Sequence, residues 1–285
     1  MSRDNSKRIT EVVEVATPTV ANNQQHRNLL SDVSLSMPTE TVELPTRGKF
    51  YDKTSTLHNK ETIEIKSLTA KEEDILSSVE YIQNGTIFDK LLESIIIDKS
   101  INPRELLIGD RNALLLAARI SGYGPEYKVK KLCQECGKNT EHVFDLTKNK
   151  TKETDLESLG VVLRDNLFWF TLPKTNIEVA IRPLTALDKN RLEKQREKKV
   201  NLGLEPSDLI DFLQSIIVEA GGSRDRGQIN EFTQIMPAID SRKIRTIYKE
   251  TTPDIDTTQS IVCSSCSWES ESEVWFGLNF FWPEH

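Results

Sequence analysis

The sequence contains few of the residues that build disulfide frameworks or catalytic sites. Only four cysteines and four histidines occur among its 285 residues. Four cysteines are too few for a disulfide-stabilised scaffold of this length, and they favour metal binding instead. Apolar runs of the roughly 18 residues that a membrane-spanning helix requires are missing, and residues 1–22 lack the apolar core of a signal peptide. We therefore expect synthesis in a cytoplasm and no membrane partner.

The motifs of several large enzyme classes are missing as well. The chain has no Gly-x-x-x-x-Gly-Lys-Ser/Thr loop, no Gly-x-Gly-x-x-Gly, no His-Glu-x-x-His and no Gly-x-Ser-x-Gly. Its four histidines include no pair at helical spacing. The net charge of −7 and the pI near 5.4 argue against a general nucleic-acid binder, because phosphates require clustered Lys and Arg. We expect no enzymatic activity and no catalytic residues.

What the sequence does contain is an internal repeat. IEIKSLTAKEEDIL at 63–76 returns 116 positions later as VAIRPLTALDKNRL at 179–192, with five identities in fourteen positions. LLESIIID at 91–98 is echoed by FLQSIIVE at 212–219, and both are apolar enough for a buried helix. The segments that begin at Asp110 and Asp240 occupy corresponding positions in the two copies but share few residue identities. The pattern predicts two diverged copies of one unit.

Both copies carry the same local signals of a strand, a helix cap and a helix. Alternating apolar residues precede Thr69 and Thr185, as in half-buried strands. Each threonine is followed three residues later by an acid, Glu72 or Asp188, which predicts a capping box at the positive end of a helix.

A further helix is predicted in DRNALLLAARISGYG. Asp110 is expected to be its N-cap and Gly122 its left-handed C-cap. Because this helix is apolar nearly all round, we expect it in the core.

Each copy ends in a Cys-x-x-Cys pair, CQEC and CSSC, and the two pairs lie 130 positions apart. Such a turn supplies two thiolates, and two turns together form the closed four-sulfur coordination of structural zinc. CQECGKNTEHVFDL resembles a zinc-ribbon knuckle, with Gly137 relieving the turn before a strand. We expect one zinc ion to join the copies, bound by Cys133, Cys136, Cys263 and Cys266.

Two other interpretations of the cysteines are open. Four reduced and merely buried thiols would leave the matched pairing unexplained. A redox dithiol would place its first cysteine at a helix N-terminus, whereas both turns lead into strand-like sequence. His142 follows on a predicted strand and is expected at the surface rather than as a ligand.

These patterns predict an α+β protein of two related strand-helix units joined at one zinc site. Residues 1–40 form an N-terminal arm, residues 41–150 the first unit with its knuckle at 133–136, and residues 151–285 the second with its knuckle at 263–266. The arm has no sustained periodicity and is either disordered or an extended segment that adds a strand to a neighbouring subunit.

Three segments of the second unit have their own interpretations. The basic stretch at 188–200 is interpreted as a solvated helix whose last turn complements its dipole, rather than as a nucleic-acid patch. EAGGSRDRG at 219–227 is interpreted as a flexible connector, because no clear helix start follows it. The segment at 275–285 holds five of the nineteen aromatic residues, which suits either core packing or a protein interface.

The motifs LPTRGKFYD, LTAKEEDIL and GDRNALLLAARISGYG, followed by a cysteine pair, are similar to those of the baseplate hub protein family of T-even-like contractile-tailed bacteriophages. The resemblance covers roughly residues 42–136 in motifs and the remainder more loosely. It implies a non-enzymatic role in the virion, in the hub of the tail baseplate, with other hub and tail proteins as partners. The second copy departs strongly from these motifs.

We therefore expect a structural component of the baseplate hub that acts through protein contacts. The arm and the C-terminal aromatic residues are candidates for contacts with neighbouring subunits. One alternative is a hub assembly factor that is absent from the mature virion. A second is a zinc-ribbon nucleic-acid-binding protein, whose affinity would fall steeply with salt.

Overall fold

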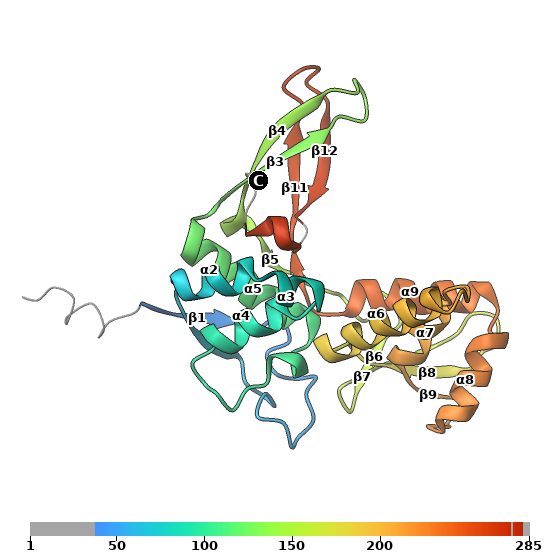
Figure 1. The fold of residues 1–285 in the computed structure, drawn as a ribbon. Helices are drawn as coiled ribbons and strands as arrows, with labels where there is room; N and C mark the ends of the chain where they lie inside the picture. The colour runs from blue at the N-terminus through green and yellow to red at the C-terminus, as the bar shows by residue number, and fades with distance from the viewer. Residues whose placement is uncertain (1–37, 275, 282–285) are drawn as a thin grey trace, which may run out of the picture. The chain divides into compact units, whose positions relative to one another are not determined.

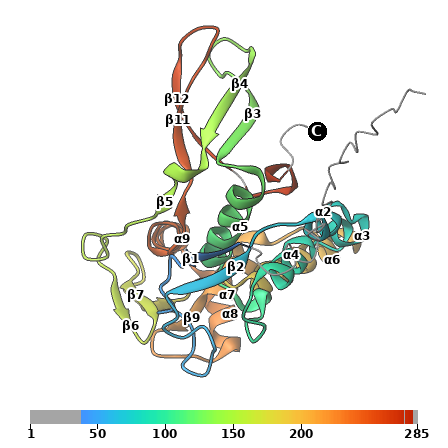
Figure 2. The ribbon, with the colours of Figure 1, turned by 90° about the vertical axis from the view of Figure 1, so that its left-hand side faces the viewer.

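The computed structural model describes residues 38–274 and 276–281. Residues 1–37, which make up most of the arm predicted over residues 1–40, therefore lie outside the described residues. The described chain has a mixed helix and strand architecture, as the predicted fold class requires. It contains one four-stranded sheet and four two-stranded sheets, all with antiparallel pairs (Figures 1 and 2).

The first half of the described chain pairs β1 (Thr39–Glu43) with β2 (Thr62–Lys66) and packs helices against them. Its helices are α2 (Ala70–Ser77), α3 (Val79–Gln83), α4 (Ile87–Ile95) and α5 (Ile108–Tyr123). Apolar residues of β2 alternate, so that Ile63 and Ile65 are both buried while Glu64 between them is exposed. Helix α5 is buried along most of its length, as predicted for its apolar sequence.

The second half contains the four-stranded sheet, in the order β6-β7-β8-β9, with four helices. Its strands are β6 (Val162–Arg164), β7 (Leu167–Thr171), β8 (Glu178–Ile181) and β9 (Ile217–Ala220). Its helices are α6 (Ala186–Asn201), α7 (Asp208–Ile216), α8 (Arg226–Ile235) and α9 (Ala238–Thr251). Residues of β7, β8, α7, α8 and α9 form a second hydrophobic core. A core of this kind is the main source of stability for the sheet.

Two hairpins carry the cysteine turns and lie side by side (Figures 1 and 2). They are built from β3 (Glu126–Leu132) with β4 (Asn139–Asp145), and from β11 (Thr258–Val262) with β12 (Glu269–Glu273). The shorter elements are η1 (Pro103–Glu105), η2 (Leu146–Lys148), η3 (Leu278–Phe280) and the paired strands β5 (Lys150–Thr151) and β10 (Ile255–Asp256). Because β5 follows the first hairpin and β10 precedes the second, their pairing brings the bases of the hairpins together.

Strand pairing at the start of the two halves follows the same scheme. Val42 lies opposite Ile63 in β1 and β2, and Phe170 lies opposite Val179 in β7 and β8. Just beyond these pairs, the Leu44 N–H donates to the Glu61 carbonyl (2.8 Å), and the Leu172 N–H donates to the Ile177 carbonyl (2.9 Å).

Two ion pairs and two buried acids also correspond. Lys66 pairs with Glu72 at 2.8 Å, and Arg182 pairs with Asp188 at 2.7 Å. Asp110 is the third residue of α5 and accepts from the Thr46 N–H (3.0 Å). Asp240 is the third residue of α9 and accepts from the Lys174 N–H (2.8 Å). In both halves a helical carboxylate therefore accepts a hydrogen bond from the loop that follows a strand, β1 in the first half and β7 in the second.

Both predicted capping boxes are confirmed. The Thr69 N–H donates to the Glu72 carboxylate at 3.0 Å, and the Thr185 N–H donates to Asp188 at 3.1 Å. These contacts satisfy backbone donors that a helix start would otherwise leave without partners.

The predicted limits of α5 are wrong at both ends. Leu107 is the N-cap, and Asp110 lies inside the helix, where burial recruits it as an acceptor for the neighbouring loop. The helix continues through Gly122 and ends at Gly124, whose φ of 82° is in the left-handed region. Gly122 instead permits close packing, since an added Cβ would lie 2.6 Å from Leu68 Cδ1.

The echoed segments at 91–98 and 212–219 are helical only in their first parts. Helix α4 ends at Ile95 and α7 at Ile216. The next residues return to extended backbone, where Ile96 bridges Ile65 and Ile217 pairs with Ile181. β-branched isoleucine suits this strand position, which explains why an apolar pattern alone did not locate the helix ends.

The C-terminal aromatic segment packs, where it is described, into the core of the first half. Phe280 and Phe281 are both 1% exposed. Phe280 contacts Tyr127 with ring centroids 5.4 Å apart, and Phe281 contacts Phe88 at 5.9 Å. Core packing therefore accounts for these two aromatic residues.

The buried carboxyl of Glu72 predicts a pH-dependent part of the stability. Burial raises the pKa of Glu72, but hydrogen bonds from Lys66, Ser94 and Thr69 outweigh burial and lower the pKa to about 2. A carboxyl whose pKa is lowered by folding stabilises the folded state above its ordinary pKa near 4.5, and this contribution is lost as the pH falls towards 2. We expect Glu72→Gln to reduce the free energy of unfolding by about 2 kcal/mol at neutral pH.

Urea unfolding at neutral pH and near pH 3 measures this effect. The difference between Glu72→Gln and the unchanged protein should shrink at the lower pH. Glu93→Gln is the control, because Glu93 is exposed in its pair with Lys90 and should contribute less than about 0.5 kcal/mol. A difference for Glu72→Gln that is the same at both pH values would contradict the pKa of Glu72.

Candidate metal centre

The two cysteine turns are formed by the same backbone contacts. The Cys133 N–H donates to the Lys138 carbonyl and the Cys263 N–H to the Trp268 carbonyl, both at 2.9 Å. The left-handed residue of the turn is Gly137 in the first hairpin (φ 68°) and Ser267 in the second (φ 59°). Each turn thus directs two sulfur atoms to one side of its hairpin tip.

The structure brings the four predicted ligands together. All four Sγ atoms lie within 4.8 Å of one another. Between the hairpins, the Sγ atom of Cys133 lies 3.7 Å from that of Cys266, and the Sγ atom of Cys136 lies 3.8 Å from that of Cys263. Cys133 and Cys263 are buried, whereas Cys266 is exposed at the edge of the cluster. The cluster can hold a metal ion, with two ligands from each hairpin.

The sulfur atoms influence one another's ionisation. The backbone N–H of Ser265 donates to the Cys263 sulfur (3.4 Å) and lowers the pKa of Cys263 to about 6. The backbone N–H of Trp268 lowers the pKa of Cys266, but desolvation and the three neighbouring sulfur atoms outweigh it and raise the pKa to about 12. Four thiolates this close repel one another, so a bound cation would favour the fully ionised set.

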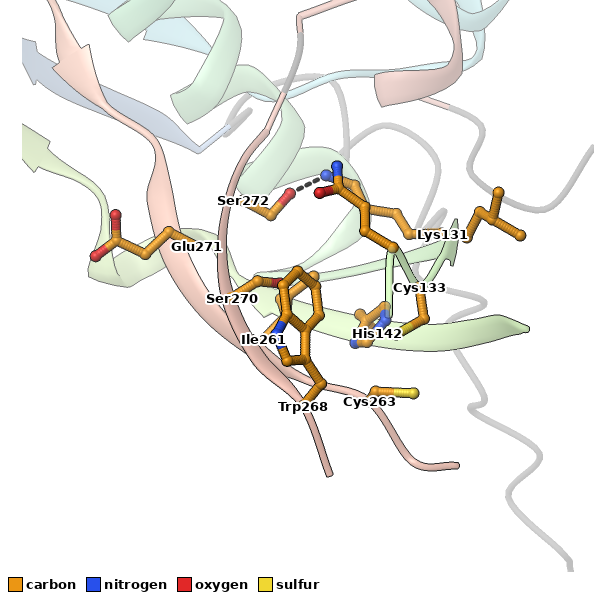
Figure 3. Close-up of a pocket in the computed structure, with 11 residues that line it drawn as sticks. Lys131, Cys133, His142, Ile261, Cys263, Trp268, Ser270, Glu271 and Ser272 are labelled. Carbon is orange, nitrogen blue, oxygen red and sulfur yellow. Dashed lines mark hydrogen bonds between the residues drawn. The ribbon is translucent and has the colours of Figure 1, made fainter. Parts of the chain in front are cut away.

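A cavity of about 170 Å³ lies beside the cysteines, between the two hairpins (Figure 3). Cys133 and His142 line it from the first hairpin, and Cys263 and Trp268 from the second. The prediction that His142 lies at the surface is wrong, because its side chain is only 8% exposed. Its Nε2 is 2.8 Å from the Thr140 hydroxyl, so that nitrogen already has a partner.

Polar contacts outside the turns hold the hairpins together. Lys131 donates to the Ser272 hydroxyl across the cavity (Figure 3). The Gln259 amide donates to the carbonyl of Asp145 and to the Asn149 side chain, each at 2.8 Å. No sequence motif marks these residues, because each is an isolated polar residue whose partner is more than 100 positions away. Their role is visible only in the folded structure.

Asp89 takes part in one of the further contacts between the two halves. Its carboxylate, 4% exposed, accepts from Arg111 at 2.5 Å and from Arg104 at 3.3 Å. Asn190 of α6 donates to the same carboxylate at 3.4 Å. Nearby, the Ile108 N–H donates to the Leu184 carbonyl (3.1 Å), so the start of α5 is hydrogen-bonded to the segment before α6.

The family model described as T4 bacteriophage base plate protein matches residues 37–282 of the chain. The chain therefore belongs to this family, and the resemblance predicted from the sequence is confirmed at that level. Family membership identifies a structural component of the phage tail baseplate, located in the virion tail and in contact with other baseplate proteins. No curated protein and no solved structure matches the chain. Within the described residues, no helix is long and apolar enough to cross a membrane.

Proposed function

We propose that the protein is a non-enzymatic structural subunit of the baseplate hub and acts through protein contacts. Membership of the baseplate family supports a structural role. The motifs LPTRGKFYD, LTAKEEDIL and GDRNALLLAARISGYG support the assignment to the hub. The cysteine cluster supports a structural rather than a catalytic metal, since four sulfur ligands leave no open coordination position for substrate or water.

The proposed ion is zinc, bound by Cys133, Cys136, Cys263 and Cys266. A tetrahedral ion with Zn–S bonds of about 2.3 Å separates its sulfur ligands by about 3.8 Å. The distances of 3.7 Å and 3.8 Å between the hairpins agree with this value. Soft thiolate ligands also favour zinc over magnesium or calcium. Bound there, the ion would fasten together two hairpins whose cysteine turns are 130 positions apart.

We further propose that the halves are diverged copies of one unit, over about residues 41–150 and 151–285. The supporting observations are the matched strand pairs, ion pairs and buried helical carboxylates of the two halves. The cysteine turns add two knuckles with the same backbone contacts. Under this proposal the metal lies where corresponding parts of the two copies meet.

Quantitative mass spectrometry of purified virions tests the proposed role. A structural hub subunit is expected in constant ratio to the other hub proteins of every particle. An assembly factor would be found in infected cells but missing from purified particles, and that result would overturn the structural role. Tail fractions from a phage that lacks the gene provide the control, in which the hub should be incomplete.

A further inference from the structure

A basic hollow of about 510 Å³ lies on the second half, between α6, α7 and the start of α8. Five cationic side chains line it against two carboxylates, on a protein whose net charge is −7. The cationic residues are Arg182, Arg191, Lys198, Lys199 and Arg226, and the acids are Asp188 and Asp211. We call this site the α6–α7 hollow.

Both acids of the α6–α7 hollow already have partners within the protein. Asp188 accepts from Arg182 at 2.7 Å and from the Thr185 N–H at 3.1 Å. Asp211 accepts from Lys199 at 2.5 Å. These contacts account for one cation each, so the remaining positive charge of the hollow is not neutralised from within.

Three cations remain to face the hollow. Lys198 has no carboxylate within ion-pair distance among the residues that the structure describes, and Arg191 reaches Asp188 only at 4.0 Å. Arg226 donates from Nη1 to the carbonyls of Gln214 and Ile217, both at 3.0 Å. Those contacts orient the guanidinium of Arg226 without neutralising it. The interpretation of 219–227 as a connector with no helix start after it is wrong, since Asp225 caps α8 directly before Arg226.

The corresponding surface of the first half has a different chemistry. At the offset of 116 positions, Arg191 and Lys198 align with Ile75 and Ile82, and Gln195 aligns with Val79. Val79 is 65% exposed and Ile82 is 36% exposed. Val79 and Ile82 lie in α3, a separate helix of the first half, so the basic hollow beside α6 has no basic counterpart at these aligned positions.

We propose that the α6–α7 hollow binds an acidic peptide segment of a partner protein. This inference rests on the proposed function, because it specifies the chemistry of one protein contact. Guanidinium groups and a lysine ammonium group that converge on one hollow can bind several carboxylates that lie close together. Other basic residues of α6 face elsewhere: Arg196 pairs with Asp208 at 3.3 Å, and Lys194 lines a different hollow beside Glu193 and Glu197. The cations thus form a local site rather than the continuous stripe that a nucleic-acid backbone requires.

Fluorescence anisotropy with a short labelled peptide that carries four aspartates tests the proposal on the full chain. The double variant Arg191→Gln/Lys198→Gln removes two charges from the hollow and should weaken binding at least about ten-fold. The matched control is Lys189→Gln/Lys194→Gln, which removes two charges from the same helix but outside the hollow. The control should bind within about two-fold of the unchanged protein, and raised salt should weaken binding.

Three results would overturn the proposal. These are no binding of the acidic peptide, equal losses in both double variants, or equal binding of a peptide with asparagine in place of aspartate. A labelled single-stranded oligonucleotide that binds more tightly than the peptide, and loses affinity only in Arg191→Gln/Lys198→Gln, would assign the hollow to nucleic acid instead. Because peptide binding is measured on isolated protein, it can succeed or fail independently of the virion measurement.

Discussion

Cys263→Ser is expected to abolish metal binding and to cause the largest loss of stability of any single change at the hairpins. The protein purified under reducing conditions should contain about one zinc ion per chain, and Cys263→Ser nearly none. Because the ion would close a loop of more than 100 residues, its removal should cost on the order of 4 kcal/mol. Elemental analysis and urea unfolding, with and without a chelator, measure both effects.

Ser264→Ala is the matched control, because Ser264 is an exposed residue of the same turn and not a sulfur ligand. It should keep the metal and the stability of the unchanged protein. A chelator should lower the stability of Ser264→Ala by the same amount as that of the unchanged protein, and should have no effect on Cys263→Ser. Metal-free protein from a reducing, zinc-supplemented purification would refute the zinc proposal.

Asp110→Ala should destabilise the protein by about 4 kcal/mol, far more than the corresponding change Asp240→Ala. Asp110 is 0% exposed and accepts from the Thr46 N–H, the Thr46 hydroxyl and the Tyr51 hydroxyl. Burial and the neighbouring Asp110 raise the pKa of Tyr51, so its hydroxyl stays protonated and donates. Removing the carboxylate leaves three buried donors without an acceptor, and each costs about 1–3 kcal/mol before relaxation.

The matched comparison is Asp240→Ala, which should cost only about 1–2 kcal/mol. Asp240 accepts from the N–H groups of Lys174 and Thr175, and Lys174 is exposed, so water can replace part of the lost contact. Urea unfolding of both variants measures the difference. Equal losses would show that burial of the donors does not set the cost of removing these carboxylates.

Much of the local structure could be predicted because it depends on neighbouring residues. The capping boxes at Thr69 and Thr185 join groups only three residues apart, so the spacing alone specified them. The turns at the cysteine pairs were predictable for the same reason. The apolar residues on nearly all sides of α5 also placed it in the core. The ends of α5 were not predictable, because burial of Asp110 against Thr46, rather than local capping, decided the role of that residue.

The site depended on sequence and tertiary structure in different ways. Regular spacing of two Cys-x-x-Cys pairs indicated the four candidate ligands, since only thiolates in matched turns combine into a closed metal site. Their approach to within 4.8 Å, the burial of His142 and the contacts of Gln259 could not be read from the chain. The α6–α7 hollow was equally hidden, because its cations come from the two helices α6 and α8 and from Arg182, the residue after β8.

The sequence by itself therefore determined the helix caps, the paired cysteine turns and the likeness to baseplate proteins, all of which are properties of short contiguous segments. Tertiary structure alone decided which distant side chains meet: the two pairs of sulfur atoms, the buried carboxylate of Asp89 with its arginines, and the cations of the α6–α7 hollow. The physical reason is the distance along the chain over which each kind of interaction acts. Backbone hydrogen bonds and caps act over a few residues, whereas burial and charge pairing act between any groups that packing of the cores brings together.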